Sequence, residues 1–167
     1  MSIEYYNQNA DEFFENTVNV DMSQLYERFT KFLNPGTKIL DAGCGSGRDT
    51  KAFLEMGYSV DAFDASEEMV KRATEYTGID VKQMTFEEVL KISCYDGIWC
   101  CASMLHVPRH SLQKTLNNLN EGLKPNGVIY VSFKLGNGER KINGRQFTDL
   151  NENSLIELIQ SHNNLFI

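Results

Sequence analysis

Three glycines and a carboxylate early in the chain have the spacing of a ligand-binding turn. Gly43, Gly45 and Gly47 alternate with small residues, and Asp41 stands two positions before the first glycine. Glycine adopts backbone angles that other residues avoid, and its lack of a side chain lets a ligand lie against the chain. A pyrophosphate, which the related pattern G-x-G-x-x-G binds, would be opposed by Asp41, whereas a ligand with an ammonium group would be attracted. A turn needed only for tight packing of a strand on a helix is the alternative.

A second carboxylate follows at a distance typical of nucleoside binding. Asp64 lies 17 residues after Gly47 and can accept both hydroxyls of a ribose in charge-assisted hydrogen bonds. As an alternative, Asp64 only caps the helix before which Ser66 stands. Met84-Thr85-Phe86 offers apolar side chains between which an adenine fits. His106 has the chemistry of a general base, with packing at a strand exit as its alternative role.

The elements that must position these residues alternate between strands and helices. Strands are predicted over residues 38–41, 58–63, 79–84, 96–102 and 128–134, and helices over 21–33, 48–56, 66–76, 86–90, 112–123 and 152–161. Gly57 is a predicted left-handed helix stop, and 135–147 is predicted to be a polar loop. The alternation predicts a doubly wound, Rossmann-like α/β fold with a mostly parallel sheet, in which ligands bind beyond the carboxyl ends of the strands.

The chain is predicted to be a single domain with three parts. Residues 1–34 form an N-terminal helical cap, in which 21–33 packs on the sheet and 1–18 covers the ligand pocket. Residues 35–134 form the cofactor-binding core, and residues 135–167 form an incomplete C-terminal part.

Four ordered segments of the core resemble the class I S-adenosylmethionine-dependent methyltransferases. They are Ile39–Gly47, Asp64–Met69, Tyr95–Ile98 together with Leu105-His106, and Leu123–Gly127. Tyr6–Ala10, Gly45–Asp49 and Ser132–Lys134 further resemble the small-molecule branch that includes the tellurite-resistance methyltransferases.

The resemblance implies S-adenosylmethionine as cofactor and assigns residues to it. Gly43 and Gly45 would hold its methionine end, Asp41 its ammonium group and Asp64 its ribose. Ala65 and Met69 would flank the adenine, and Ala102 and Leu105 would line the far wall. The implied cofactor-binding set is Asp41, Gly43, Cys44, Gly45, Gly47, Asp64, Ala65, Met69, Thr85, Phe86, Ala102 and Leu105. Many relatives have an acid after the third strand, where this chain has Thr85-Phe86.

The expected reaction is in-line transfer of a methyl group to a small molecule, with S-adenosylhomocysteine as product. A sulfonium is already a strong electrophile, so the protein needs mainly to align the reactants and exclude water. No catalytic residue is therefore fixed by the pattern, and His106 and Tyr6 are the candidates. A non-catalytic S-adenosylmethionine-binding module is one alternative. An NAD-dependent oxidoreductase, for which the glycine spacing and Asp41 are wrong, is the other.

The composition of the chain limits the kinds of partner that it is expected to bind. The formal net charge of −7, with scattered Lys and Arg, disfavours nucleic acid. Apolar runs fall short of the roughly 20 residues of a membrane helix, and residues 1–6 lack the pattern of a signal peptide, so a cytoplasmic location is expected. The four cysteines lack metal-binding spacing and are predicted to be free thiols, and no metal site is expected. His110 and His162 are expected at the surface. The substrate-side candidates are Tyr5, Tyr6, Lys134, Glu139 and Arg145.

The resemblance also implies a departure at the C-terminal end. Family members add a strand six and an antiparallel strand seven beside strand five, whereas this sequence reaches only Ile167. Strands six and seven are therefore expected to be missing or incomplete, with the sequence being part of a longer chain or a partner covering the edge. An uncovered edge on strand five would favour self-association.

Overall fold

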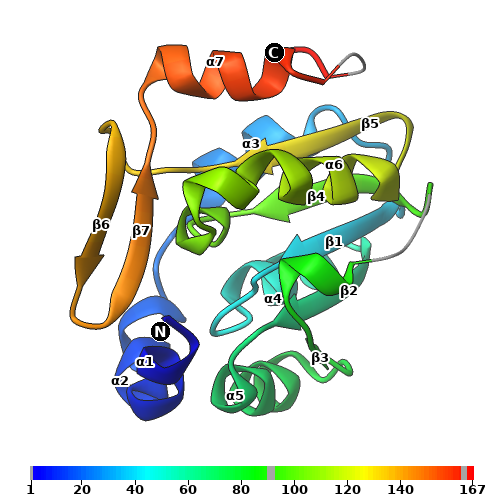
Figure 1. Ribbon diagram of the computed structural model, residues 1–167. Helices are drawn as coiled ribbons and strands as arrows, with labels where there is room; N and C mark the ends of the chain where they lie inside the picture. Colours follow the sequence, from blue (N-terminus) through cyan, green and yellow to red (C-terminus); the bar gives the residue numbers. More distant parts are fainter. Residues whose placement is uncertain (1, 90–92, 163–164) are drawn as a thin grey trace.

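A computed structural model of the chain describes residues 2–89, 93–162 and 165–167. Its main sheet has five parallel strands in the order β3-β2-β1-β4-β5 (Figure 1). The strands are β1 (Lys38–Ala42), β2 (Ser59–Asp64), β3 (Lys82–Gln83), β4 (Tyr95–Cys100) and β5 (Leu123–Val131). The strand order reverses between β1 and β4, and such a switch point is where open α/β sheets bind ligands. The predicted doubly wound, mostly parallel fold is confirmed.

Aromatic side chains join one face of the sheet to α3 (Ser23–Thr30) and α4 (Arg48–Glu55). Trp99 of β4 is fully buried, stacks on Tyr130 with ring centroids 4.0 Å apart and meets Phe29 of α3 at 5.1 Å. The predicted packing helix is therefore confirmed, although it is shorter than 21–33. The sequence offers Asp21 as an N-cap of this helix, but the N-cap is Met22. The Asp21 carboxylate accepts a hydrogen bond from the Ser23 N–H at 2.9 Å.

Aliphatic side chains cover the opposite face through α6 (Leu112–Gly122) and α7 (Glu152–Gln160). Leu112, Leu116 and Leu119 of α6 are buried, as their spacing predicts. The expectation of a surface position for His162 is wrong, because this residue is only 6% exposed. Its ring lies against the carbonyls of Leu158 and Gln113, where the end of α7 meets α6.

Helix boundaries in the core follow the predicted caps. The Ser66 hydroxyl accepts a hydrogen bond from the Met69 N–H at the start of α5 (Glu67–Thr77), and Gly78 ends this helix with φ of 77°. Gly57, after α4, has φ of 88°, as predicted for a left-handed stop.

β3, the element after it and β5 also depart from their predicted lengths. β3 has two residues instead of six, and a single 3₁₀ turn, η1 (Phe86–Glu88), replaces the helix predicted over 86–90, whose last residue lies outside the described ranges. β5 begins earlier and ends earlier than predicted. Leu123 pairs with Tyr95 and Val128 with Gly97, so residues 124–127 form an irregularity between these pairs.

The polar loop predicted over 135–147 is wrong, because this segment forms most of a β-hairpin. β6 (Gly138–Ile142) pairs antiparallel with β7 (Arg145–Asp149). The connecting Asn143 and Gly144 have φ of 50° and 79°, the left-handed pair that two-residue hairpin turns favour. The hairpin stands apart from the main sheet, and none of the described residues adds a strand beside β5.

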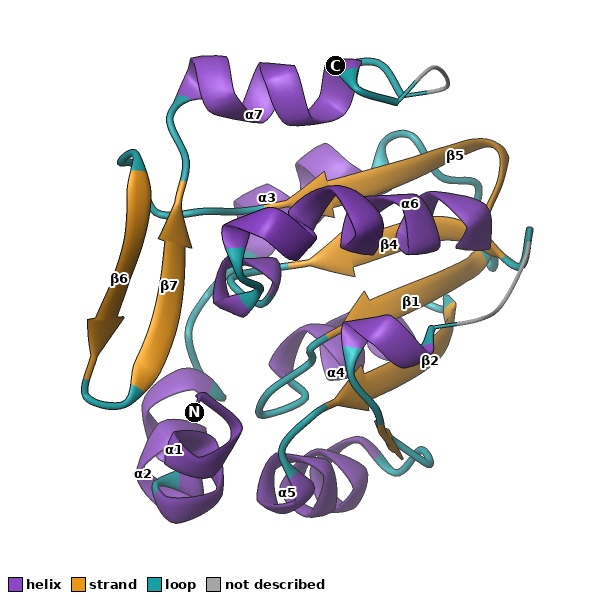
Figure 2. Cartoon of the chain, viewed as in Figure 1, coloured by secondary structure: helices purple, strands orange, loops and turns teal. Residues whose placement is uncertain are grey.

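The helices α1 (Ser2–Gln8) and α2 (Ala10–Thr17) lie beside α5 and β7 (Figure 2). The strand arrows of the main sheet point toward this side of the molecule, so the N-terminal helices and the hairpin meet near the carboxyl ends of the strands. Two 3₁₀ turns, η2 (Met104–His106) and η3 (Arg109–Ser111), link β4 to α6. Across the described ranges, every helix is too short or too polar to cross a lipid bilayer.

Candidate functional site

The turn after β1 has three left-handed glycines. Gly43, Gly45 and Gly47 have φ of 77°, 53° and 79°. The N–H groups of Gly43 and Cys44 both donate to the Phe63 carbonyl at 2.9 Å, which ties the turn to the end of β2. Because left-handed backbone costs other residues about 1–2 kcal/mol each, this conformation alone favours glycine.

The surroundings of the three glycines show what each position excludes. A Cβ at Gly43 would lie 2.5 Å from the Ser103 Cβ, and one at Gly47 would lie 2.8 Å from the Thr77 Cγ2. At these two positions the protein's own packing requires glycine. A Cβ at Gly45 would lie 3.2 Å from the Phe13 ring, which comes from the N-terminal α2. Gly45 therefore faces the cap.

Asp64 connects the end of β2 to the glycine turn. Its Oδ2 accepts a hydrogen bond from the Gly45 N–H and its Oδ1 accepts one from the Ser66 N–H, both at 2.9 Å. Burial raises the pKa of this carboxyl, and the backbone N–H donors oppose the shift. A carboxylate oxygen has further acceptor capacity, so an oriented Asp64 can still accept from a diol.

Asp41 lies behind the turn. It is 1% exposed, and its Oδ2 accepts a hydrogen bond from the Thr50 hydroxyl at 2.6 Å. Burial, with Asp49 as a neighbouring negative charge, raises the pKa of Asp41 to about 8. The structure thus surrounds this carboxyl with protein and disfavours its charged form.

The residues expected around an adenine lie at the ends of β2 and β3. Met69 is buried at 1% exposure, Ala65 is half-buried, and the Phe86 ring packs edge-on against Phe63 with centroids 5.4 Å apart. Phe86 also lies near the glycine turn, 3.8 Å from where a Cβ of Gly43 would stand. The Thr85 hydroxyl donates to Glu88 at 2.9 Å.

The far wall is formed after β4. Ala102 is exposed with φ of 51°, and its N–H donates to the Ser132 hydroxyl at 2.7 Å. Leu105 is buried in the core, and so is Cys44, whose burial raises the pKa of its thiol. The left-handed conformation of Ala102 is uncommon for a residue other than glycine.

The two catalytic candidates, far apart in sequence, contact each other. The Tyr6 hydroxyl lies 2.8 Å from His106 Nε2, and His106 Nδ1 lies 2.7 Å from the Gln146 carbonyl. A carbonyl only accepts, so Nδ1 carries the proton, and in neutral His106 the Tyr6 O–H donates to Nε2. Burial lowers the pKa of His106, which keeps its imidazole neutral.

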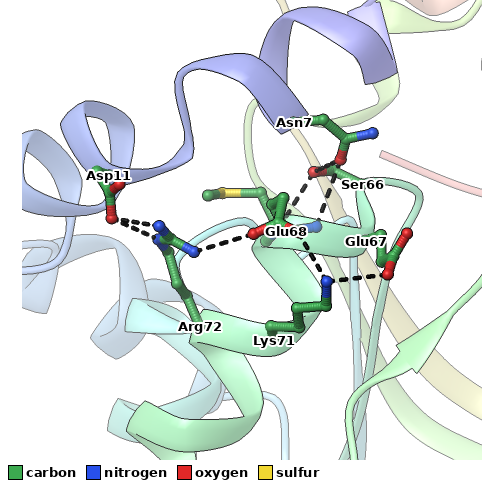
Figure 3. A network of polar contacts seen from close by, with 8 residues as sticks. Asn7, Asp11, Ser66, Glu67, Glu68, Lys71 and Arg72 are labelled. Atoms are coloured by element: carbon green, nitrogen blue, oxygen red, sulfur yellow. Dashed lines mark hydrogen bonds and ion pairs between the residues drawn. The ribbon is translucent and has the colours of Figure 1, made fainter.

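Polar contacts fix the N-terminal helices to α5 (Figure 3). The Ser66 hydroxyl donates to the Asn7 side-chain oxygen at 2.6 Å, and Arg72 of α5 pairs with both Asp11 and Glu68. A ring contact between Tyr6 and Phe13, with centroids 5.0 Å apart, places the aromatic side of this cap over Gly45.

The structure brings three of the five substrate-side candidates together and places the other two elsewhere. Tyr5, Tyr6 and Arg145 come together at the turn end of the hairpin. The Glu139 carboxylate instead accepts hydrogen bonds from the Gln146 side chain and from the Arg109 N–H. The Lys134 carbonyl accepts a hydrogen bond from the Leu150 N–H.

Phe13, Asn7 and Gln146 were not among the predicted site residues. Asn143-Gly144 is the one local signal that would have placed Gln146, because this dipeptide is typical of a hairpin turn.

Comparisons with known proteins assign the family. Residues 39–127, just over half of the chain, match a protein family described as a methyltransferase domain. The chain is 29% identical over 140 residues to the ubiquinone biosynthesis O-methyltransferase of Rickettsia canadensis, covering 79% of this chain and 58% of that protein. The chain spans about half the length of the curated relatives it matches.

Two solved structures share the fold. The 1,6-didemethyltoxoflavin-N1-methyltransferase of Burkholderia thailandensis, with S-adenosylhomocysteine bound, superposes with a TM-score of 0.73 at 23% identity, covering 95% of this chain and 72% of that one. The magnesium protoporphyrin IX methyltransferase of Synechocystis, with S-adenosylmethionine bound, gives 0.70 at 16% identity and covers 95% and 82%. This is the fold that the sequence resemblance to class I methyltransferases predicted. The chain belongs to the methyltransferase-domain family.

Proposed function

We propose that this protein binds S-adenosylmethionine at the carboxyl ends of β1 and β2 and methylates a small molecule. The observation that carries the proposal is the hydrogen bond that joins the turn after β1 to the end of β2. Asp64 accepts the Gly45 N–H there, within the residues that match the methyltransferase family. The relative from Rickettsia is named for O-methylation in ubiquinone biosynthesis, and the Burkholderia enzyme acts on a small heterocycle.

The residues at this junction have the chemistry that the cofactor needs. Asp64, already oriented by two backbone N–H groups, would accept the ribose hydroxyls. The turn from Gly43 to Gly47, including Cys44, would hold the methionine end. Its left-handed backbone presents peptide groups without side chains.

The remaining assigned residues would surround the base and the far wall. Ala65, Met69, Thr85 and Phe86 would contact the adenine, and Ala102 and Leu105 would close the opposite side. Asp41 is buried, whereas an ammonium group of a ligand would need an accessible carboxylate. Its bond to Thr50 and its raised pKa favour a role in holding the turn, and direct contact with the ammonium group remains the less supported assignment.

When bound, S-adenosylmethionine supplies a methyl group on a positively charged sulfur, which a lone pair of the acceptor displaces in line. The chain's own contribution is to align the acceptor, to exclude water with α1 and α2, and to take up a proton. His106 suits proton uptake because it is neutral and because its Nδ1–H is fixed on the Gln146 carbonyl. Tyr6, whose O–H donates to His106 Nε2, would relay a proton from the acceptor to His106. An acceptor hydroxyl, which must lose a proton, is the class that this arrangement favours.

The free thiols favour a cytoplasmic location for this reaction, and the net charge favours a small-molecule acceptor. All four cysteines are free, which is typical of a reducing compartment such as the cytoplasm. The net charge of −7 favours a small acceptor over nucleic acid.

Titration calorimetry with S-adenosylhomocysteine and with NADH tests the cofactor. We expect binding of S-adenosylhomocysteine alone, and binding of NADH alone would contradict the proposal. Transfer of a labelled methyl group to a panel of phenols, amines, thiols and metalloid oxyanions then tests turnover. A protein that binds the cofactor but methylates no member of the panel would be a non-catalytic binding module.

A further inference from the structure

Arg145, the first residue of β7, is held between aromatic rings beside the Tyr6–His106 pair. The carbon of its guanidinium group lies 4.4 Å from the centroid of the Tyr5 ring and 5.3 Å from that of the Phe147 ring. One ring comes from α1 and the other from β7, so the guanidinium is clamped between the cap and the hairpin. Such stacking fixes the plane of an arginine and with it the direction of its N–H donors.

This cation has no matching anion in the described part of the chain. No carboxylate there lies within ion-pair distance of Arg145, and its Nε is buried without a hydrogen-bond partner. Other arginines are paired: Arg140 on the same hairpin with Asp149, Arg48 with Asp49 and Arg72 with Asp11. The Tyr6 hydroxyl, a neutral group, is its polar neighbour. A buried N–H donor without an acceptor is unfavourable, so an added acceptor at Nε would complete the site.

Tyr6 locates Arg145 relative to the cofactor residues. Burial raises the pKa of Tyr6, a hydrogen bond with Arg145 lowers it, and the charge of Asp64 raises it further, so both charged groups lie near enough to act on Tyr6. Phe13 contacts the Tyr6 ring and faces Gly45 of the glycine turn. His106 is bonded to the carbonyl of Gln146, the residue after Arg145. An anion on Arg145 would therefore lie beside the proton-accepting pair.

We propose that Arg145 binds the carboxylate of the acceptor, so that the substrates of this protein are carboxylates with a nucleophilic group, most fittingly planar aromatic ones. The inference rests on the proposed function, because it assigns the acceptor side of the same site. The Nε–H and one terminal N–H of the guanidinium form a fork that matches two carboxylate oxygens. The rings of Tyr5, Tyr6 and Phe147 offer a planar substrate aromatic contacts. The carboxylate of the cofactor is the other source of the same chemistry, and its proposed place is at the glycine turn, which Phe13 faces at Gly45.

Binding to the full chain loaded with S-adenosylhomocysteine tests this inference. The probes are benzoate and 3,4-dihydroxybenzoate, each compared with its neutral amide by calorimetry. We expect at least one acid to bind the wild type about tenfold or more tightly than its amide, as loss of a charge-assisted bond predicts. Arg145→Gln should abolish this preference and leave the affinity for S-adenosylhomocysteine unchanged, which also shows that the variant is folded. Arg145→Lys, which keeps the charge but not the fork, should retain part of the preference.

Lys141→Gln is the matched control, because it removes the same charge from an exposed position of the same hairpin. It should retain the full preference for the acid. Equal binding of acid and amide, binding of neither, or a preference that survives in Arg145→Gln would overturn the inference while the proposed function stands. Weaker binding of S-adenosylhomocysteine to Arg145→Gln, with unchanged binding of 5′-methylthioadenosine, would assign Arg145 to the cofactor's carboxylate and also overturn it. Failure of the wild type to bind S-adenosylhomocysteine would instead overturn the proposed function, and this inference with it.

Discussion

Asp64 and the three glycines of the first turn would form the cofactor side of the proposed site. The Asp64 carboxylate is oriented by the N–H groups of Gly45 and Ser66, so its direction is set before any ligand arrives. Gly43 and Gly47 serve the packing of the chain on itself, and Gly45 faces the cap. The three glycines look equivalent in the sequence, but each position requires glycine for a reason of its own.

Asp64→Ala should weaken the binding of S-adenosylhomocysteine by about 2–4 kcal/mol, because two charge-assisted hydrogen bonds to the ribose are lost. Titration calorimetry measures the change. Glu55→Ala removes a carboxylate from an exposed position of α4 and should leave the dissociation constant unchanged. If the two variants bind equally well, Asp64 does not contact the ribose.

Gly43→Ala should destabilise the fold more than Gly36→Ala. The two glycines have nearly the same φ, 77° and 76°, but a Cβ at Gly36 meets nothing within 4 Å, whereas one at Gly43 meets the Ser103 Cβ at 2.5 Å. Both variants incur the left-handed penalty of about 1–2 kcal/mol, and Gly43→Ala adds an overpacking cost of about 1–3 kcal/mol. Urea denaturation of both variants gives the difference, and equal losses would show that Ser103 moves aside freely.

The N-terminal helices and the β6–β7 hairpin are joined to each other and would together form the acceptor side of the proposed site. Tyr6 of α1 meets His106 of η2, and His106 in turn meets Gln146 of β7. The Ser2 hydroxyl also accepts a hydrogen bond from the Gln146 N–H at 2.9 Å. His106 is therefore the point at which three elements are joined.

The stability of this junction should depend on pH through His106. Its pKa is lowered in the folded state by burial, so the unfolded chain binds the proton first as the pH falls. The contribution of His106 is therefore complete above the unfolded pKa of about 6.5 and is lost as the pH falls toward the folded value. The free energy of unfolding of the wild type should decrease from pH 7 to pH 5 more than that of His106→Gln, whose amide keeps both hydrogen bonds.

Urea denaturation of the two proteins at several pH values checks this difference. His110→Gln, at an exposed position, is the control and should follow the wild type. Parallel curves for the wild type and His106→Gln would contradict a buried, neutral His106.

The elements predicted well from sequence are those whose pattern is local. The leucines of α6 repeat at helical spacing, Ser66 and Gly78 delimit α5, and the apolar residues of β1 and β4 mark buried strands. The hairpin was missed because β6 is mostly exposed and charged, and because β7, although partly buried, has Phe147 as its single apolar residue. Neither strand has the apolar alternation that marks a half-buried strand. The cap contacts could not be predicted, because Tyr6 and His106 are 100 residues apart and meet only through the tertiary fold.

The site shows the same division. Its cofactor side follows from a motif and a spacing along β1 and β2, whereas its acceptor side comes from segments at opposite ends of the sequence. The buried position of His162 was missed for a similar reason, because it depends on how α7 meets α6.

The whole molecule presents one edge of its main sheet at β5. Within the described ranges no strand pairs with the outer side of β5, and β5 carries the apolar run Val128–Val131. Unpaired strand edges of this kind associate with one another unless they are covered.

The chain should therefore self-associate in a concentration-dependent manner. Sedimentation velocity from low to high micromolar concentration should show a rising average mass. A single monomeric species throughout this range would mean that the edge is protected.

The hydrogen bond between Ser2 and Gln146 spans 144 residues of sequence. On a ribosome, which adds about 5–20 residues per second, α1 and α2 are made well before the hairpin and must wait for it. The part of the fold made of residues 38–131 can form during this interval. Under the proposed function, selectivity for the acceptor would therefore be acquired only after β7 emerges, and a nascent chain that has not yet reached β7 would possess the nucleoside half of its site without the half that chooses what is methylated.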